Sequence, residues 1–267
     1  MTDIKEFINW MRENEKSENT IYMYSHQVER YFQKYESITK ADLIGFKQEL
    51  LMSHSPKTVN LYLSSINCYM KFKGIEEIQV KKVRVQKASY VQNVITLDEY
   101  KHLIKCLEDD GKRDIEARFK ILAMTGARVS EAIRITKRDL DQGFAELWTK
   151  GKIRTIHIPV KLREDIADVY KDYGDDELLF KNKWNARITS GGVSEMCRRY
   201  AKKYNLPREH MHPHAFRHFF AIQFLKNNNN ISLLADMLGH SGINTTMIYL
   251  RQSKEEQNRQ INEAVNW

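Results

Sequence analysis

An arginine between two predicted helices is the first residue whose position suggests chemistry. Arg128 follows Gly126, and glycine is typical of the position where a helix ends. Backbone N–H groups point outward at the start of the next helix, so an arginine there could hold a phosphate together with them. Glu131, one helical turn later, could fix the guanidinium in place. Taken alone, the spacing favours a surface ion pair between Arg128 and Glu131.

A second group of polar side chains lies in the segment 212–218. In a helix, His214, Arg217 and His218 would share one face, because they are three and four positions apart. Histidines suggest zinc first, but no cysteine or carboxylate stands close by in the sequence, and the arginine would repel a cation. This group therefore suits an oxyanion better than a metal ion.

A tyrosine follows a glycine-rich turn near the end of the sequence. Gly239 and Gly242 enclose His240, and Asn244 could cap a short helix that presents Tyr249. A lone tyrosine usually serves packing. In a chain that also carries arginines able to bind phosphate, Tyr249 becomes a candidate nucleophile.

Two lysines compete for one role in a predicted β-hairpin. Residues 144–148 and 154–158 alternate between apolar and polar side chains, and the turn between them carries Lys150 and Lys152. A lysine at the tip of a hairpin is ordinarily a solvated charge. Beside a phosphate it could protonate a departing oxygen, and Lys150 is the preferred candidate, with Lys152 as its rival.

Together these segments predict a site for phosphodiester transfer. Arg128, Arg217 and His240 would neutralise the charge that develops on the non-bridging oxygens in the transition state. Tyr249 would be the nucleophile, and Lys150 the general acid. This chemistry needs no metal ion, and the sequence offers no cluster of carboxylates to hold one.

Helices and one hairpin must position these residues. Apolar side chains recur three and four apart from Ile21 to Tyr35 and from Val59 to Met70, which predicts amphipathic helices with caps at Thr20 and Ser55. A capping box at Thr96 begins another helix. The fold class is therefore mostly α with a small antiparallel β-sheet.

We expect a helical domain over residues 1–80, a basic interdomain linker over 81–94 and a catalytic domain over 95–267. The linker alternates without a helical period, so an edge strand is its alternative. Its positive charge suits a DNA backbone. The residues predicted to contact DNA are Lys57, Lys81, Lys82, Arg84, Lys87 and Lys152.

The composition narrows the class of protein. The 267 residues include 43 lysines and arginines against 35 aspartates and glutamates, and the resulting net charge of +8 favours a polyanionic partner. No run of about 18 apolar residues could span a membrane, and no signal sequence is visible, so we expect a cytoplasmic protein. Three widely spaced cysteines form neither a disulfide framework nor a paired metal motif.

The order of the candidate residues resembles the tyrosine recombinase family, which includes phage-type integrases, Xer-type recombinases and conjugative-transposon integrases. The N-terminal helices are similar to the SAM-like core-binding domain of that family. The matching segments are 19–24, 57–60, 125–131, 214–218, 238–241 and 245–249.

This resemblance implies a site-specific DNA recombinase that needs neither ATP nor a metal cofactor. Tyr249 would attack a DNA phosphate to form a 3′-phosphotyrosine, and Lys150 would protonate the 5′-oxygen that leaves. His214 would exchange the proton of the tyrosine, while Glu131 and His218 would support the site.

The resemblance also implies an assembly. Four copies would act on two double-stranded DNA sites and pass through a Holliday junction, with residues 254–267 as a tail that docks on a neighbouring protomer. Accessory proteins that bend DNA are possible partners. Because the core-binding helices begin the sequence, we expect one of the simpler two-domain recombinases.

Two positions depart from the pattern of the family. The hairpin turn is about one residue shorter than the usual glycine-lysine-glycine version, which keeps Lys152 as a rival of Lys150. Phe216 stands where the family usually has leucine, which changes packing rather than chemistry.

Three other classes of protein remain as alternatives. A type IB topoisomerase-like strand transferase would share the chemistry, but the two-domain layout and the tail favour recombination. A catalytically silent DNA-binding regulator is disfavoured because every catalytic position holds a competent residue. A metal-dependent nuclease would need a carboxylate cluster.

Overall fold

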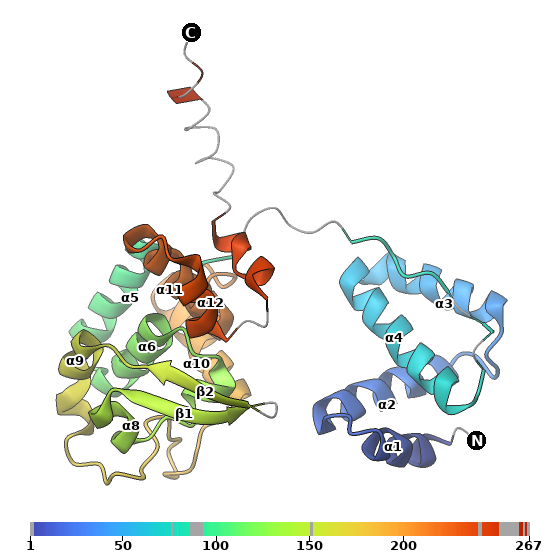
Figure 1. Cartoon of the computed structure of the whole chain (residues 1–267), viewed down its shortest axis with the longest axis horizontal. Coiled ribbons are helices and arrows are strands. Elements are labelled where there is room, and N and C mark those ends of the chain that lie inside the picture. Colours follow the sequence, from blue (N-terminus) through green and yellow to red (C-terminus); the bar gives the residue numbers. More distant parts are fainter. Residues whose placement is uncertain are drawn as a thin grey trace. The chain divides into compact units, whose positions relative to one another are not determined.

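The chain folds into two compact units, Met1–Lys87 and Ala88–Trp267, each with a hydrophobic core of its own (Figure 1). The computed structural model describes residues 3–75, 77–78, 80–85, 93–149, 152–239, 242–250, 262–263 and 265. Within these ranges the chain is mostly helical with one antiparallel pair of strands, so the predicted fold class is confirmed.

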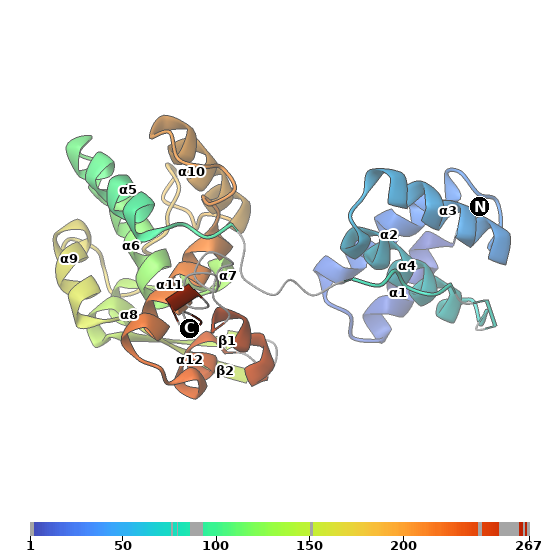
Figure 2. The same cartoon turned by 90° about the horizontal axis from the view of Figure 1, so that it is seen from above.

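The first unit is built from helices alone in its described part (Figure 2). Aromatic rings fill its core, where the ring of Tyr31 stacks on Tyr35 and meets Phe46 edge-on. The helices are α1 (Ile4–Glu13), α2 (Glu18–Phe32), α3 (Lys40–Ser53) and α4 (Pro56–Phe72).

Hydroxyl caps set where two of these helices begin. Ser55 accepts a hydrogen bond from the backbone N–H of Thr58, so the predicted cap of α4 is confirmed. The predicted cap of α2 is wrong, since Ser17 occupies that position and accepts from the N–H of Thr20. The first residue of the helix, Glu18, is exposed and belongs to no apolar face. The apolar run therefore does not reveal where the helix begins.

The first residues of the predicted linker pack on the first unit. Val80 is buried in its core, and the amine of Lys47 donates a hydrogen bond to the backbone oxygen of Lys81 at 2.6 Å. The side-chain amide of Asn60 pairs with both backbone groups of Val83, at 2.8 and 2.9 Å. The amide side chain of Asn60 thus forms the two hydrogen bonds that a neighbouring strand would otherwise form with Val83.

The second unit surrounds a short hairpin with helices. Strands β1 (Phe144–Thr149) and β2 (Lys152–His157) pair antiparallel, with Leu147 opposite Arg154, so the predicted hairpin is confirmed. The helices are α5 (Leu97–Asp109), α6 (Arg113–Thr125), α7 (Val129–Ala132), α8 (Lys137–Gln142), α9 (Val160–Tyr170), α10 (Ser190–Lys203), α11 (Pro213–Asn227), α12 (Ile231–Leu238) and the 3₁₀ turns η1 (Ile243–Thr245) and η2 (Met247–Tyr249).

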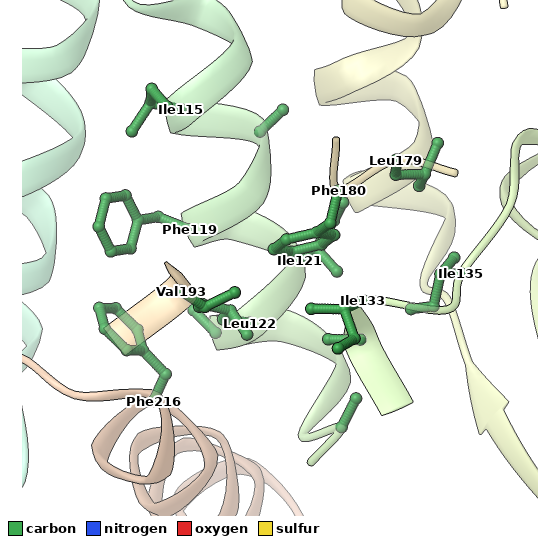
Figure 3. Packing of buried hydrophobic residues seen from close by; sticks show 14 of the residues in the cluster. Ile115, Phe119, Ile121, Leu122, Ile133, Ile135, Leu179, Phe180, Val193 and Phe216 are labelled. Atoms are coloured by element: carbon green, nitrogen blue, oxygen red, sulfur yellow. The ribbon is translucent and has the colours of Figure 1, made fainter. Parts of the chain in front are cut away.

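Helix α6 runs through the core of this unit and fixes the orientation of α11. The ring of Phe119 lies 5.3 Å from that of Phe216, centroid to centroid, and both side chains are fully buried (Figure 3). Arg217, the next residue of α11, is buried as well. The exchange of leucine for phenylalanine at position 216 is therefore absorbed by ring packing.

Helix α6 ends at Gly126, as predicted, in the left-handed conformation with φ of +62°. A β-carbon at this position would lie 2.4 Å from Cδ1 of Phe220 in α11, so a side chain has no room. The close approach joins the end of α6, where the predicted site begins, to α11.

No helix of the described residues is both long and apolar enough to cross a membrane.

Candidate active site

Arg128 occupies the N-cap position of α7, as the sequence predicts, and Glu131 binds it twice. The backbone N–H of Arg128 donates to Oε2 of Glu131 at 2.7 Å, and its Nη1 donates to Oε1 at 2.8 Å. Both contacts orient the guanidinium, whose side chain remains 42% exposed. Arg128 is therefore fixed in direction yet accessible to a ligand.

Glu131 is buried with a side-chain exposure of 1%, and a second arginine reaches it. Nη1 of Arg154, from β2, donates to Oε2 of Glu131. Burial by itself would raise the pKa of Glu131, but the N–H of Arg128 and the charges of Arg154 and Arg128 together hold that pKa below its ordinary value. Glu131 is thus an anion at neutral pH.

Arg154 is the member of the site that the sequence analysis did not select. Its side chain is 8% exposed, and burial lowers its pKa despite the nearby carboxylate. A signal was present, because Arg154 and Ile156 are two positions apart and must lie on the same face of β2, and Ile156 is buried. A charged residue on the buried face of a strand needs a partner.

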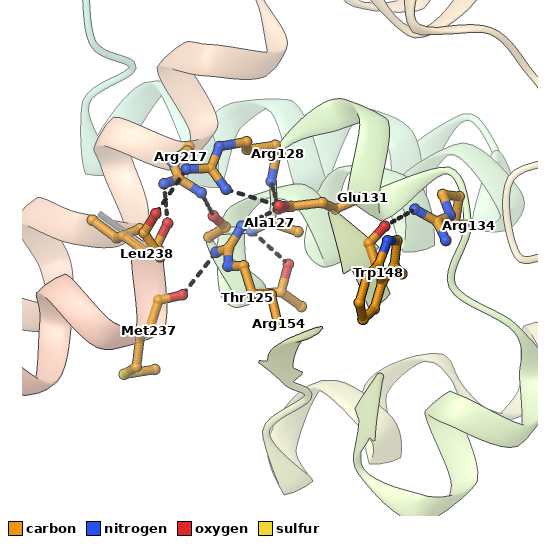
Figure 4. Close-up of polar contacts among 12 residues, drawn as sticks. Thr125, Ala127, Arg128, Glu131, Arg134, Trp148, Arg154, Arg217, Met237 and Leu238 are labelled. Atoms are coloured by element: carbon orange, nitrogen blue, oxygen red, sulfur yellow. Dashed lines mark hydrogen bonds and ion pairs between the residues drawn. The ribbon is translucent and has the colours of Figure 1, made fainter. Parts of the chain in front are cut away.

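Arg217 lies deeper than either of these arginines. Its exposed fraction is 2%, and it donates from Nη1 to the backbone oxygen of Gly126 at 2.7 Å. Burial first, and then the positive charges of Arg154 and Arg128, lower its pKa to about 10. Figure 4 shows Arg217 and Arg128 lying next to each other above Glu131. The structure thus brings together Arg128 and Arg217, which the sequence placed in one candidate site.

The C-terminal end of α12 is attached to all three arginines. Helix ends leave backbone carbonyls without partners, and their partial negative charge attracts cations. Three consecutive carbonyls each accept one hydrogen bond: Met237 from Arg154 at 2.8 Å, Leu238 from Arg217 at 2.5 Å and Gly239 from Arg128 at 3.0 Å. These bonds fix the C-terminal end of α12 and its cap, Gly239, which directly precedes His240 in the sequence.

Gly239 itself is required by the geometry of this attachment. It adopts the left-handed conformation with φ of +58°, and a β-carbon there would lie 2.6 Å from Nε of Arg154. A glycine at this position therefore lets the arginine pass beneath the turn. From the sequence, Gly239 is recognisable only as a turn residue.

Tyr249 is buried at the end of η2, with 9% of its surface exposed, and its hydroxyl lies 2.8 Å from Nδ1 of His218. Burial raises the pKa of Tyr249, while the charge of Arg217 acts in the opposite direction. The predicted helix capped by Asn244 is wrong, because two 3₁₀ turns are present and Gly242 precedes the first. The turns still bring the tyrosine to the histidines of α11.

The histidines of α11 share one face, as predicted. The rings of His214 and His218 are 4.2 Å apart, centroid to centroid, and meet edge-on. His214 is exposed on the surface of the site, and its pKa is lowered by the part of the ring that is buried and by the charges of Arg217, His212 and Arg128. Nδ1 of His212 accepts the N–H of Ala215 and caps the helix.

The other predicted residues fall outside the described part of the chain or on the surface of the first unit. Lys150, His240 and Lys87 are outside the described residues, as is the side chain of Lys152. The predicted tail, residues 254–267, is described only at 262–263 and 265. In the first unit the side chains of Lys57, Lys81, Lys82 and Arg84 are exposed. The described residues contain no group of three histidine, cysteine, aspartate or glutamate side chains that could hold a metal ion.

Comparison with known proteins connects this geometry to a family. A model of the phage integrase family matches residues 93–256. The tyrosine recombinase XerA of Pyrococcus furiosus is 29% identical over 260 residues, which cover 93% of this chain and 88% of that protein. The tyrosine recombinase XerD of Staphylococcus epidermidis is 27% identical over 286 residues, which cover 96% and 95%.

A solved structure supports the fold over the whole length. The integrase of the transposon Tn1549, in complex with transposon right end DNA, superposes with a TM-score of 0.72 and covers 100% of both chains. The two sequences are 18% identical, so this likeness concerns the fold.

Proposed function

Because this chain belongs to the phage integrase family and is a tyrosine site-specific recombinase that acts on DNA, we propose that Tyr249 cleaves each strand at a phosphate held by Arg128 and Arg217. The observation that carries this assignment is the excess of positive charge around Glu131. Three guanidinium groups, from Arg128, Arg154 and Arg217, lie around that one buried carboxylate.

A phosphate would relieve the repulsion within this cluster. The depressed pKa of Arg217 reflects the two neighbouring arginines as well as burial. The side chain of Arg128 is 42% exposed, and a guanidinium has five N–H donors in a planar fork. Arg128 can therefore also donate to the non-bridging oxygens, whose charge grows in the transition state.

The proposed reaction is an exchange of one phosphate ester for another. The hydroxyl oxygen of Tyr249 attacks the phosphorus, its proton passes to a histidine of α11, and the bond from phosphorus to the 5′-oxygen breaks. Lys150, or Lys152 in its place, protonates that oxygen, and His240 supplies a further hydrogen bond to the phosphate. The 3′-phosphotyrosine conserves the bond energy, so the reaction needs neither ATP nor a metal ion.

The described neighbours of the hairpin lysines and of His240 support this scheme. The strands that carry the hairpin lysines include Arg154, which is bonded to Glu131. Gly239, which accepts from Arg128, directly precedes His240. Both candidate donors thus follow directly from segments anchored in the arginine cluster.

We further propose that Lys57, Lys81, Lys82, Arg84, Lys87 and Lys152 contact the DNA backbone. Four copies would join two DNA sites through a Holliday junction, with residues 254–267 exchanged between protomers in the cytoplasm. The integrase of Tn1549, which has the same fold, has been seen bound to transposon end DNA.

A nicked suicide substrate tests the nucleophile. The full chain is incubated in EDTA with nicked duplexes that tile the DNA flanking its gene, and a denaturing gel reports covalent adducts. We expect an adduct with the wild type and with Tyr173→Phe, a half-buried tyrosine of the same unit, and none with Tyr249→Phe. An adduct that persists in Tyr249→Phe contradicts the assignment, and an adduct that disappears with EDTA contradicts the metal-free reaction.

Paired sites test the finer proposal. Duplexes carrying two copies of the cleaved sequence should give recombinant products and a four-protomer complex with the wild type. A chain that ends at residue 253 should still form the adduct but lose the recombinant products. Relaxation of supercoiled DNA without recombinants would instead indicate a type IB topoisomerase-like activity.

A further inference from the structure

The hydroxyl of Tyr249 is bonded to His218, which the family resemblance treats as a supporting residue. Nδ1 of His218 lies 2.8 Å from the phenolic oxygen, within the range of a direct hydrogen bond. The two rings lie 5.4 Å apart, centroid to centroid. His214, to which the resemblance gives the proton, is one helical turn away and touches the ring of His218.

Packing holds the tyrosine in this position. Tyr249 belongs to a small hydrophobic cluster with Phe220, Ala221 and Leu225 of α11 and with Leu234 and Leu238 of α12. The helix that carries His218 therefore also supplies the surface against which the phenol ring rests. The contact between hydroxyl and imidazole follows from a fixed arrangement of the backbone rather than from two mobile surface side chains.

We propose that His218 is the general base that takes the proton of Tyr249 during strand cleavage, an inference that rests on the proposed function of Tyr249. The O–H bond of the phenol breaks as its proton moves to Nδ1 of His218, and the freed electron pair forms the bond to phosphorus. The bond from phosphorus to the 5′-oxygen breaks, and the departing oxygen receives its proton from the hairpin lysine. In the reverse step the imidazolium returns the proton to Tyr249.

A base is needed because the phenol is neutral before attack. Burial raises the pKa of Tyr249 above its ordinary value near 10, so phenolate is scarce at neutral pH. Arg217 is the charged group that acts on the tyrosine and stabilises the phenolate as it forms. Transfer of the proton to an imidazole already in contact removes the cost of creating free phenolate.

The surroundings of His214 oppose its protonation. Burial of part of the ring, and then the charges of Arg217 in α11, of His212 at the cap of α11 and of Arg128 at the start of α7, lower the pKa of His214. His214 is also exposed on the surface of the site, where it can donate a hydrogen bond to a phosphate. The geometry thus separates two roles: His218 faces the nucleophile, and His214 faces solvent and substrate.

The tautomer of His218 tests the hydrogen bond without DNA. A base at Nδ1 requires that the hydroxyl donates and that the proton of the neutral ring sits on Nε2. We expect long-range ¹H–¹⁵N spectra of the full chain to show the Nε2–H tautomer for His218 in the wild type, and a shifted Nδ1 resonance in Tyr249→Phe. A neutral His218 protonated on Nδ1 overturns the proposal, since that ring would donate to the phenol.

The pH dependence of cleavage separates the two histidines. Asparagine places an amide near the position of Nδ1, so His218→Asn can keep a hydrogen bond to the phenol but cannot take its proton. On a nicked duplex that the wild type cleaves, we expect His218→Asn to cleave about 100-fold more slowly at pH 7, within the range for loss of general base catalysis. Its rate should then rise about tenfold per pH unit toward pH 9, as hydroxide replaces the base.

His214→Asn is the matched control for base catalysis. It should cleave more slowly than the wild type but keep the shape of the wild-type pH profile. A wild-type profile in His218→Asn, or a rate proportional to hydroxide in His214→Asn, overturns the proposal. If Tyr249→Phe cleaves the same duplex, the proposed nucleophile fails instead, so the two failures are distinguishable.

Discussion

In the described part of the second unit two carboxylates, those of Glu116 and Glu131, are buried, and their surroundings differ in charge. Glu116 of α6 binds Arg113 at 2.7 Å and Lys120 at 2.7 Å. Those cations also meet two further carboxylates, Asp168 at 2.9 Å from Arg113 and Asp165 at 3.9 Å from Lys120. Asp165 also binds Lys161 at 2.5 Å, so three cations of this network meet three carboxylates.

The network of Glu131 is not matched in this way. Arg128 and Arg154 bind the carboxylate directly, and Arg217 lies close enough to both that their charges depress its pKa. Backbone carbonyls, of Gly126 and at the end of α12, supply further acceptors. A balanced network can serve the fold alone, whereas an unbalanced one is completed by an anion. The comparison therefore indicates that the network of Glu131, and not that of Glu116, binds an anion.

Removing the carboxylates should have the largest effect and should separate the two networks. Glu131→Gln is expected to lower the free energy of unfolding by about 3–5 kcal/mol, because it leaves buried arginines without their counter-charge. Glu116→Gln should also be destabilised. Sulfate stabilises most proteins by exclusion, but it should stabilise Glu131→Gln by more than the wild type or Glu116→Gln, since it can bind among the arginines. Urea unfolding in sulfate and in chloride measures the difference.

Equal gains from sulfate in both variants would contradict the contrast. In that case the arginines around Glu131 would offer no site for an anion, and the support for a phosphate-binding cluster would be lost. The comparison is internal to one unit of one chain, so general effects of salt on folding cancel.

Replacing one arginine in each network should separate stability from cleavage. Arg217→Met is expected to slow formation of the covalent adduct by about 100- to 1,000-fold, the usual loss when one transition-state hydrogen-bond donor is removed. Arg113→Met removes the guanidinium of the balanced network, and its folded fraction should cleave at the wild-type rate. Rates per folded protein come from adduct gels combined with circular dichroism. A comparable loss of cleavage in Arg113→Met would mean that fold stability limits both variants.

Two glycines test whether Arg154 positions the site. Alanine at Gly239 meets the cost of a left-handed conformation, about 1 kcal/mol, and also displaces Arg154, which lies 2.6 Å from the new β-carbon. Alanine at Gly143, also left-handed, approaches Arg163 only to 3.4 Å. We expect both variants to lose stability and Gly239→Ala alone to lose cleavage. Thermal unfolding and adduct assays on both variants provide the check; unchanged cleavage in Gly239→Ala would remove Arg154 from the positioning of the turn.

The sequence predicted the parts of the site that residue type and spacing reveal. Arg128 was recognisable because a glycine stop precedes it, and Arg217 because histidines flank it at helical spacing. Helix starts at Ser55 and Thr96 were predicted from short-range capping bonds, which the structure contains. Local rules succeed where the partner lies within a few residues.

Contacts between distant segments were beyond such rules. The bond from Arg154 to Glu131 depends on the face that β2 turns inward, and the carbonyls of α12 become acceptors only when the helix end meets the arginines. The predicted cap at Asn244 was wrong because packing of Tyr249 against α11 is compatible with 3₁₀ turns instead of an α-helix. The same packing makes His218, rather than His214, the neighbour of the hydroxyl.

The smallest expected effect concerns the cap at the edge of the arginine cluster. His212 accepts the N–H of Ala215 at Nδ1, which it can do only when that nitrogen is unprotonated. Burial is the main cause that lowers the pKa of His212 below 6.5, so this contribution to stability is complete above pH 6.5 and is lost as the pH falls below it. Asparagine caps helices at any of these pH values, and a cap contributes about 1 kcal/mol. The free energy of unfolding should therefore fall between pH 7.5 and pH 5 by less in His212→Asn than in the wild type. His214, whose pKa is lowered in the same direction, contributes to the fall in both proteins. An identical fall in both proteins would show that protonation of His212 leaves the start of α11 intact.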